Sequence, residues 1–419
     1  MIDLKFLREN VELIKNNSKN KNANPDIDSI IKLDEERRDI IAKVEELKNE
    51  RNSTSKKIAQ LKRNNENAND LISEMKEVSA TISTYDSNLK KVETTLNTEL
   101  LKVPNLSHSS VPIGKSEKDN KIIRQWGDIP TSKTGKNHIE ISEKLGIIDF
   151  KRGAKVSGSG FAFLTGKGAR LERALINFFL DSHNKSGYSE IFSPFVVNED
   201  SMRGTGQLPK MAEDMYHCQE DNVYLIPTAE VPLTNFHRND MMKFDELPKK
   251  FCGYSACFRR EAGSYGKEVR GFLRVHQFNK VELVKFSKPE ESASDLESLT
   301  NDSEELLKQL GLSYRVLLLC TGDTSFASSK TFDLEVWSAG EKAWLEVSSC
   351  SNFIDFQARR ANIRFKRKDD TKPEFVHTLN GSGLATPRIM VSLIENNYDG
   401  EKIHIPEVLR KYTGFDYID

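Results

Sequence analysis

Five basic residues lie close together between positions 259 and 274, and two carboxylates and three glycines lie in or near the same stretch. Guanidinium groups match the geometry of phosphates and carboxylates, and glycines let a backbone approach a ligand closely. The stretch is therefore suited to a ligand that combines phosphates, a carboxylate, an amine and hydroxyls. The basic residues are Arg259, Arg260, Lys267, Arg270 and Arg274, the carboxylates are Glu261 and Glu282, and the glycines are Gly263, Gly266 and Gly271.

The same stretch is predicted to form two strands, Gly253–Glu261 and Leu273–Leu283, because bulky and polar residues alternate on both sides of the glycines. A hairpin of this kind could also be a solvated surface element whose charges pair with one another. Its charge pattern alone does not separate this interpretation from a ligand site. Other parts of the chain must decide between the two.

Several stretches of the sequence resemble one enzyme family. Residues Phe258-Arg259-Arg260-Glu261 closely resemble motif 2 of the class II aminoacyl-tRNA synthetases, and the continuation through His276–Glu282 is similar to its form in the seryl-tRNA synthetase family. Three further stretches are similar to that family and follow its order, namely Pro227–Thr234, Glu346–Asn352 and His377–Ala385. The resemblance covers nearly the whole chain. It implies an α+β fold, with an N-terminal antiparallel coiled-coil arm and an antiparallel-sheet catalytic domain.

The resemblance also implies a reaction. A ligase of this family activates L-serine with ATP to seryl-adenylate and transfers the seryl group to the 3′ end of serine tRNA, and of selenocysteine tRNA where that is present. Charge develops on the α-phosphoryl oxygens, so catalysis needs fixed cations more than an acid–base pair. Arg259 and Arg388 are the implied catalytic residues, and Arg259 is implied to bridge the serine carboxylate and the α-phosphate.

The resemblance implies separate residues for the phosphates and for the adenine of ATP. Arg274 would neutralise the distal phosphates, and Glu261 would accept a hydrogen bond from the adenine amino group. Phe278 and the guanidinium of Arg388 would hold the adenine ring between them. The implied ATP-binding set is Arg259, Arg260, Glu261, Arg274, Val275, Phe278, Glu346, Val347, Ser348, Ser349 and Arg388.

Magnesium and serine complete the implied ligands. Glu346 and Ser349 would hold an Mg²⁺ ion that accompanies ATP, since oxygen ligands suit this ion. In the serine site, Thr228 and Glu230 would take the ammonium group, and Glu282 would receive the side-chain hydroxyl. The full implied serine-binding set is Thr228, Ala229, Glu230, Arg259, Glu282, Asn380 and Ser382.

Each of these residues also has a purely structural alternative. The charged side chains could form surface salt bridges, with Glu346 paired to Arg359 or Arg360, and Phe278 could be a core aromatic. We expect the run Gln357–Asn362 to have a structural role. Two other functions stay open, namely a seryl-adenylating paralogue that loads a carrier protein and a non-catalytic RNA-binding paralogue.

The N-terminal hundred residues supply the predicted arm. Apolar residues with a 3-4-3-4 spacing run from Ile30 to Leu61 and again from Leu71 to Leu96, and an asparagine-rich break over residues 63–70 separates them. Sustained heptads with a short turn between them predict two helices paired as an antiparallel hairpin about 50 Å long. Apolar spacing over residues 1–24 predicts one short helix before them.

One segment of the arm, Arg51–Asn65, is basic and contains no acid. Basic helical segments are typical of phosphate-backbone contacts, although they also occur on solvated coiled coils with no nucleic-acid partner. The candidate tRNA-binding residues are Arg51, Lys56, Lys57, Lys62 and Arg63.

The rest of the chain is expected to form the catalytic domain. We place the arm at residues 1–102, a proline- and glycine-containing linker at 103–118 and the catalytic domain at 119–419. An amphipathic helix over Gly168–Asn184 and a strand over Tyr188–Asn198 correspond to the family's dimer-interface motif, which implies a homodimer. Neither GxGxxG nor GxxxxGK[ST] occurs, so a Rossmann or P-loop nucleotide site is not predicted.

Composition limits the setting in which the protein acts. The chain has 419 residues, a formal net charge of −1 and 30% charged residues, so a basic surface for nucleic acid must be local. Its five cysteines form no CxxC pair and have no zinc-ligand spacing, which favours reduced thiols in the cytoplasm. The first residues carry charges where a signal peptide needs an apolar run, and no apolar run is long enough to span a membrane.

Overall fold

The computed structural model describes residues 1–262, 271–368 and 370–419. Gly263, Gly266, Lys267 and Arg270 of the basic stretch lie outside the described residues. The described chain divides into two compact units. One unit comprises residues 2–19 and 23–104, and the other comprises Met1, residues 20–22 and residues 105–419.

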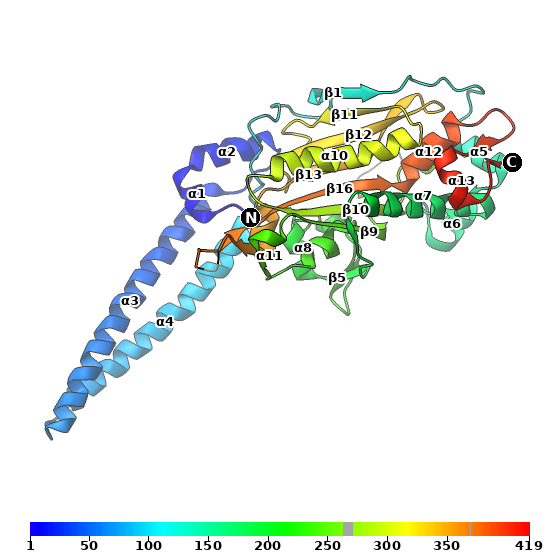
Figure 1. Ribbon diagram of the computed structural model, residues 1–419. Helices are drawn as coiled ribbons and strands as arrows, with labels where there is room; N and C mark the ends of the chain where they lie inside the picture. The colour runs from blue at the N-terminus through cyan, green and yellow to red at the C-terminus, as the bar shows by residue number, and fades with distance from the viewer. Residues whose placement is uncertain (263–270, 369) are drawn as a thin grey trace. The chain divides into compact units, whose positions relative to one another are not determined.

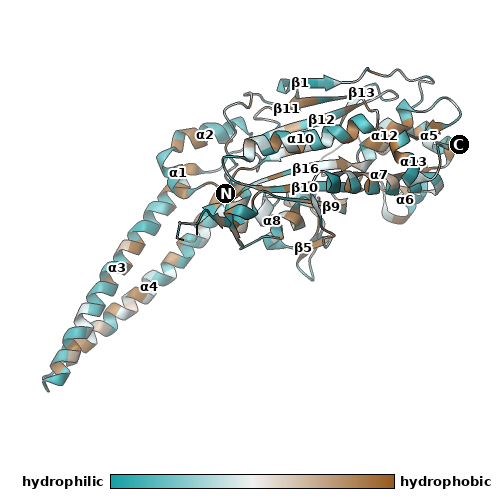
Figure 2. Cartoon of the chain, viewed as in Figure 1, coloured by the Kyte–Doolittle hydropathy of each residue, from teal (hydrophilic) through white to brown (hydrophobic). Residues whose placement is uncertain are grey.

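The first unit is helical. Its two long helices, α3 (Ile27–Arg63) and α4 (Asn69–Leu100), pack side by side as the predicted antiparallel pair (Figure 1). Ile40, Val44 and Val92 are buried together in the seam. Apolar and polar residues alternate in short patches along both helices (Figure 2), as a narrow seam with solvated flanks requires. The coiled-coil prediction is confirmed.

Two short helices precede the pair, where the apolar spacing predicts one. They are α1 (Leu4–Glu9) and α2 (Val11–Asn20). Asn10 separates them because its backbone leaves the helical conformation and its N–H donates to Leu7 O. The single-helix prediction is therefore wrong at this point.

The second unit is built on an eight-stranded sheet, counted over the described residues. Neighbouring strands are antiparallel except the edge pair β4 and β9, which is parallel. This arrangement confirms the predicted antiparallel sheet. In spatial order the strands are β1 (Lys121–Trp126), β11 (Tyr314–Leu318), β12 (Lys330–Ser338), β13 (Ala343–Asn352), β16 (His377–Ala385), β10 (Gln277–Ser287), β9 (Lys249–Phe258) and β4 (Ser189–Glu190).

Three helices lie across one face of this sheet: α7 (Gly166–Lys185), α10 (Ser292–Gln309) and α12 (Thr386–Asn396) (Figure 1). Their apolar sides and the facing strand residues form the largest core cluster, in which Phe179 and Leu299 are fully buried. Burying an amphipathic helix against a sheet in this way is the main source of stability for such a layer. Val281 and Leu283 of β10 belong to this core, so Lys280 and Glu282, which alternate with them, project from the opposite face of the sheet.

Shorter elements surround the sheet. The helices are α5 (His138–Leu145), α6 (Phe150–Ser157), α8 (Glu199–Thr205), α9 (Glu230–Asn235), α11 (Phe356–Ala361) and α13 (Glu407–Thr413). Single turns of 3₁₀ helix are η1 (Glu117–Asp119), η2 (Ala212–Asp214) and η3 (Phe244–Glu246). The short strands are β2 (Ile148–Asp149), β3 (Phe163–Leu164), β5 (Val196–Asn198), β6 (His217–Cys218), β7 (Val223–Leu225), β8 (Met241–Lys243), β14 (Arg364–Lys366), β15 (Glu374–Phe375), β17 (Ile403–His404) and β18 (Tyr417–Ile418).

Three predicted strand boundaries need correction. The strand predicted to reach Glu261 ends at Phe258, and Glu261 itself has a positive φ of 52°, which an extended strand cannot contain. Its partner begins at Gln277 instead of Leu273. The strand predicted over Tyr188–Asn198 is divided into β4 and β5, which belong to different sheets. Pro194 lies between them and has no N–H to donate to a ladder.

Candidate active site

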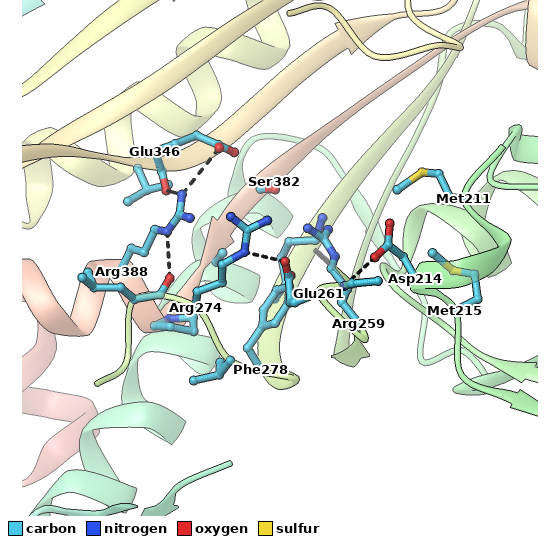
Figure 3. A pocket seen from close by; sticks show the side chains of 17 residues that line it. Met211, Asp214, Met215, Arg259, Glu261, Arg274, Phe278, Glu346, Ser382 and Arg388 are labelled. Carbon is cyan, nitrogen blue, oxygen red and sulfur yellow. Dashed lines mark hydrogen bonds and ion pairs between the residues drawn. The ribbon is translucent and has the colours of Figure 1, made fainter. Parts of the chain in front are cut away.

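A pocket of about 340 Å³ opens beside the ends of β9, β10, β13 and β16, and the basic stretch forms much of its wall (Figure 3). The lining includes both positive and negative side chains, with two methionines at one side. The lining residues are Met211, Asp214, Met215, Arg259, Glu261, Ala262, Leu273, Arg274, Val275, Phe278, Lys280, Glu346, Val347, Ser382, Ala385, Pro387 and Arg388.

Arg259 is held at the wall by both its backbone and its side chain. Its N–H donates to His276 O at 2.9 Å, one residue beyond the end of β9. Its Nε donates to Pro227 O at 3.3 Å, and its guanidinium lies 5.2 Å from the centre of the Phe278 ring. The guanidinium therefore faces the pocket at a fixed place, and within the described residues it forms no ion pair with an acidic side chain.

Arg274 and Glu261 pair with each other across the pocket, with 2.5 Å between Nε and Oε2. The loop that carries Glu261 is anchored by Asp214, which accepts from Ala262 N–H at 2.9 Å through its side chain and from Arg260 N–H at 2.9 Å through its carbonyl. The Arg260 side chain is exposed and does not line the pocket. Arg260 therefore helps to form the pocket wall only through the hydrogen bond that its backbone N–H donates to Asp214.

Arg388 lies in the first turn of α12, where Pro387 occupies one of the first helical positions. Its Nε donates to Leu273 O at 3.1 Å, and its Nη1 donates to Glu346 O at 2.9 Å and lies 3.5 Å from Glu346 Oε2. The cation that lies over the Phe278 ring is Arg259. Phe278 and Arg388, expected to hold the adenine ring between them, both line the pocket.

Glu346 does pair with an arginine, as its structural alternative supposed, but with neither of the two that were named. Arg359 pairs with Asp355 at 2.7 Å, and the Arg360 guanidinium lies 4.7 Å from the ring of Phe356. The arginine that contacts Glu346 is Arg388, in the first turn of α12.

Glu346 and Ser349 both line a second hollow of about 650 Å³ next to the first. Residues three apart in a regular strand point to opposite faces, but the register of β13 against β12 slips by one residue near Val347. This bulge allows both side chains to face the same hollow. Asp333 lies opposite Ser349 and lines it too, and burial followed by the charge of Glu346 raises the pKa of Asp333 well above its ordinary value.

A second group of polar residues is buried beside the first pocket. Thr228 Oγ1 donates to Glu282 Oε2 at 3.0 Å, and Glu282 is only 1% exposed. Glu230 accepts from Gln357 Nε2 at 2.7 Å. Burial and then the charge of Glu282 raise the pKa of Glu230 to about 7. Two carboxylates thus lie close together in a place where water cannot solvate them freely.

The strand β16 completes this group. Ser382 pairs in register with Glu282 on β10, and its carbonyl accepts from Ser348 Oγ at 2.6 Å. Asn380 is buried near Glu230 and contributes to lowering the pKa of that carboxyl. Val275 and Ala229 are buried and can contribute only packing and backbone groups.

Sequence reasoning missed several residues of the site. Lys280, Met211, Asp214 and Met215 line the pocket, but only Lys280 lies within a stretch that resembles a family motif. Residues 211–215 carry no periodic or motif signal, because a loop brings them to the site. Gln357, expected to be purely structural, donates to a carboxylate of the substrate-binding set.

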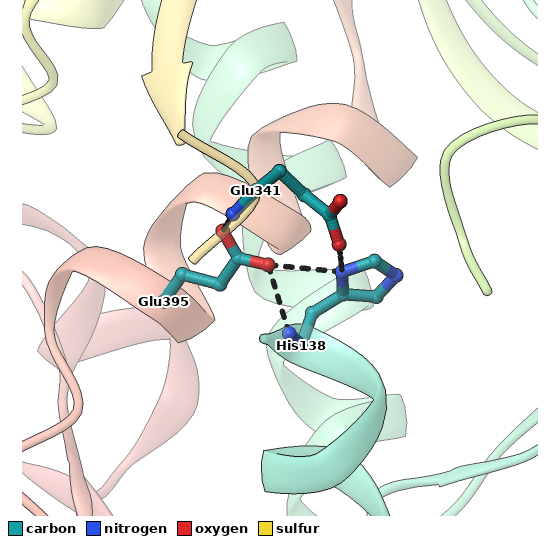
Figure 4. Close-up of side chains that lie close together, drawn as sticks. All are labelled: His138, Glu341 and Glu395. Carbon is teal, nitrogen blue, oxygen red and sulfur yellow. Dashed lines mark hydrogen bonds and ion pairs between the residues drawn. The ribbon is translucent and has the colours of Figure 1, made fainter. Parts of the chain in front are cut away.

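A network outside the pocket joins α5 and α12 to the beginning of the segment that carries Arg274. His138 is fully buried, its Nδ1 lies 3.0 Å from Glu395 Oε1, and its Nε2 accepts from Phe272 N–H at 3.1 Å (Figure 4). Gly271 packs so closely on this ring that a Cβ there would lie 2.3 Å from Nε2. The partners indicate a neutral imidazole with its proton on Nδ1.

His138, Glu341 and Glu395 bring three possible metal ligands within 4.8 Å of one another. Glu395 already accepts hydrogen bonds from Ser338, from Gly340 N–H and from the backbone of His138. Burial opposes the effect, but the hydrogen bonds from the side chains of His138 and Ser338 and from the His138 backbone lower the pKa of Glu395. An ion would have to displace donors that already satisfy both groups, so we assign no metal to this network.

Comparisons with known proteins bear on the identity of the chain. Residues 1–107 match the family model for the seryl-tRNA synthetase N-terminal domain, and residues 215–397 match that for the class II tRNA synthetase core domain (G, H, P, S and T). A serine–tRNA ligase from Caldicellulosiruptor saccharolyticus is 54% identical over 423 residues, covering 100% of both chains. The chain belongs to the seryl-tRNA synthetase family.

Other family members agree with this assignment. A serine–tRNA ligase from Chlorobium phaeobacteroides strain BS1 is 59% identical over 328 residues, which cover 76% of each chain. The crystal structure of seryl-tRNA synthetase from Pyrococcus horikoshii complexed with ATP is similar with a TM-score of 0.93 and 37% identity, covering 100% of this chain and 99% of that one. None of the helices in the described residues is long and apolar enough to cross a membrane.

Proposed function

We propose that the protein is an ATP-dependent serine–tRNA ligase that forms seryl-adenylate in the pocket beside β10 and then transfers the seryl group to the 3′ end of serine tRNA. One observation carries the proposal. Arg259, Arg274 and Arg388 line one pocket together with Lys280 and Ser382, and these last two residues contact or pair with Glu282 of the neighbouring carboxylate group. Phosphates can bind at one end and a small amino acid with an ammonium and a hydroxyl at the other.

In the first step, a serine carboxylate oxygen attacks the α-phosphorus, the bond to the oxygen that bridges to the β-phosphate breaks, and pyrophosphate leaves. Negative charge builds up on the α-phosphoryl oxygens during this displacement. Arg259 faces the pocket and can contact both the carboxylate and the α-phosphate, so it aligns the two reactants and stabilises that charge. In the second step, a hydroxyl of the terminal tRNA ribose attacks the seryl carbonyl carbon and AMP leaves.

Serine recognition falls to the buried group. The ionised carboxylate of Glu230, with Thr228 beside it, receives the ammonium, and Glu282 accepts a hydrogen bond from the side-chain hydroxyl. Ser382 and Asn380 lie on the neighbouring strand and bound the same space. A site built to bond a hydroxyl leaves polar groups unpaired when alanine enters, so it can discriminate strongly against alanine.

The adenine and phosphate contacts follow from the lining. The face of Phe278 and the guanidinium of Arg388 bound the adenine space, and Arg274 is released from Glu261 to the distal phosphates when ATP enters. Glu346 and Ser349, with Asp333 beside them, offer only oxygen donors, which fit Mg²⁺. When bound there, the ion would neutralise phosphate charge.

The helical unit is proposed to bind tRNA. Lys56, Lys57, Lys62 and Arg63 are exposed at the end of α3, and Arg51 is half-buried. Contacts of this kind to a phosphate backbone are strongly salt-dependent and carry little base information. We place the protein in the cytoplasm, in keeping with its five unpaired cysteines.

We also propose a homodimer. Phe192 and Val196 are 79% and 43% exposed in the Gly168–Asn198 region, where a monomer would lose stability by exposing them to water. A fully active monomer in sedimentation at micromolar concentration would rule this assembly out.

Charging of purified tRNA with labelled serine tests the function as a whole. The label should become acid-precipitable only with serine, ATP and tRNA together. Transfer to a carrier protein in place of tRNA would favour the carrier-loading paralogue. Absence of any serine-dependent reaction would favour the non-catalytic RNA-binding alternative.

A further inference from the structure

Lys280 is a buried lysine at the junction of the two parts of the site. Only 6% of its surface is exposed, yet it lines the pocket together with Arg259 and Ser382. Burying an ammonium group costs free energy unless a counter-charge compensates for it. The proposed function so far gives this residue no task.

The counter-charge of Lys280 is Glu282. The two residues are two positions apart on β10 and therefore project from the same face of the strand. The Lys280 ammonium forms an ion pair with Glu282 Oε2, which is also the oxygen that accepts from Thr228 Oγ1 at 3.0 Å. Within the described residues, the Glu282 carboxylate forms this one ion pair and this one hydrogen bond, and both involve Oε2. The other oxygen, Oε1, is left for a ligand.

Glu282 has a second charged neighbour, Glu230. The charge of Glu282 helps to raise the pKa of Glu230, whereas the charge of Lys280 lowers it. Two carboxylates this close together repel each other unless a cation offsets their charge. Gln357 and Asn380 also face Glu230, but they are neutral. Lys280 is thus the cation that offsets the charge of these two carboxylates.

We propose that Lys280 is a positioning residue that fixes Glu282 as a hydrogen-bond acceptor for the substrate hydroxyl and thereby sets the selectivity for serine over alanine. The inference rests on the proposed function, in which Glu282 receives that hydroxyl. With Oε2 held by Lys280 and Thr228, Oε1 stays aimed at the ligand. Without the ammonium, Glu282 loses the partner that fixes Oε2 and can turn toward other donors, and it then no longer offers a fixed acceptor.

The test uses a neutral variant, Lys280→Met, and a charge-conserving control, Lys280→Arg, in the full-length protein. The probes are the non-reactive sulfamoyl analogues of seryl-adenylate and alanyl-adenylate, which differ only in the hydroxyl, with Kd measured by calorimetry. In Lys280→Met, the ratio of the alanyl Kd to the seryl Kd should fall about 10- to 100-fold, the range expected for a hydrogen bond to a charged group. Lys280→Arg should retain most of the ratio.

A merely structural role would weaken both analogues equally. An unchanged ratio in Lys280→Met, whether or not both affinities fall, therefore overturns the inference. Thermal unfolding and ATP binding without serine verify that each variant is folded.

The variant Glu282→Gln separates this inference from the proposed serine site. If Glu282→Gln lowers the ratio and Lys280→Met does not, only the role of Lys280 is wrong. If Glu282→Gln leaves the ratio unchanged, the hydroxyl site itself is wrong.

Discussion

At the scale of single residues, the site separates two kinds of charge. Arg259 and Arg388 face a pocket that water can enter, and their guanidinium groups are held mainly by backbone carbonyls. Glu282 is buried and Glu230 is half-buried, and both are held by side chains. Cations near solvent suit a ligand that arrives with several phosphates, whereas buried carboxylates suit a small ligand whose polar groups must be matched individually.

Replacement of Glu282 by alanine tests the serine end of the site. The variant Glu282→Ala should lose most serine activation, because the substrate hydroxyl loses a charged acceptor worth roughly 1.5–3 kcal/mol. ATP should still bind, since its contacts lie on other residues of the pocket. Pyrophosphate exchange and ATP titration measure the two effects. Serine activation with a near wild-type kcat/KM would show that the hydroxyl binds elsewhere.

The raised pKa of Glu230 predicts a pH dependence of serine binding. Its carboxyl has a pKa of about 7, so it is mostly ionised above pH 7 and becomes protonated as the pH falls below that value. Protonation removes the charge that binds the ammonium of serine. The kcat/KM for serine should therefore fall on the acid side of about pH 7, with the pKa of the free enzyme setting the midpoint.

A profile of kcat/KM measured from pH 5.5 to 9 provides the test. The variant Glu230→Gln should have much lower activity and should lack this acid limb. A wild-type profile that stays flat down to pH 5.5 would mean that Glu230 does not bind the ammonium in its charged form.

At the scale of elements, the sequence was informative where a periodic pattern or a motif covers the element. The heptads of α3 and α4 and the alternation in β9 and β10 lead to the observed helices and strands. Boundaries were less predictable around the site, because Glu261 adopts a left-handed backbone conformation and Pro194 divides one predicted strand into two. The bulge at Val347 and the loop at residues 211–215 depend on tertiary packing and have no local signal.

The network around His138 has a predictable effect on the ATP end of the site. Phe272 N–H donates to His138, and the next residue, Leu273, provides the carbonyl that holds Arg388. The variant His138→Ala leaves a buried N–H and the carboxylate of Glu395 without this partner, which should cost about 1–3 kcal/mol of unfolding free energy. Without His138 we also expect Leu273 to move, and with it the carbonyl that holds Arg388. The KM for ATP should therefore rise more than the KM for serine.

Denaturant unfolding and the two KM values measure these effects. The variant Lys144→Ala, in the same helix α5 but outside the pocket lining, is a matched control. Equal changes in both KM values, or none, would show that the network stabilises the fold without positioning the ATP site.

At the scale of the whole molecule, the two units are proposed to divide the work between tRNA and the activation of serine. Replacing residues 30–96 with a short linker should spare serine-dependent pyrophosphate exchange, because every pocket residue lies in the other unit. The same change should severely reduce tRNA charging, since the basic segment of α3 is removed. Normal charging by the shortened protein would contradict the proposed role of the helical unit.

Choice of tRNA follows from the same division. Serine is encoded by codons with unrelated anticodons, so an anticodon swap in a serine tRNA should affect charging little. Deletion of the long variable arm of that tRNA should affect it greatly, because an elongated helical pair with exposed cations can grip a backbone by its shape.

The central claim is that the pocket beside β10 activates serine with ATP. Amino-acid-dependent exchange of labelled pyrophosphate into ATP measures this step alone, without tRNA. With the full-length protein and Mg²⁺, exchange should be rapid with serine and at least about 100-fold slower with alanine, since a site that bonds a hydroxyl rejects a ligand without one. Exchange that is absent with serine, or equally fast with alanine, would contradict the account.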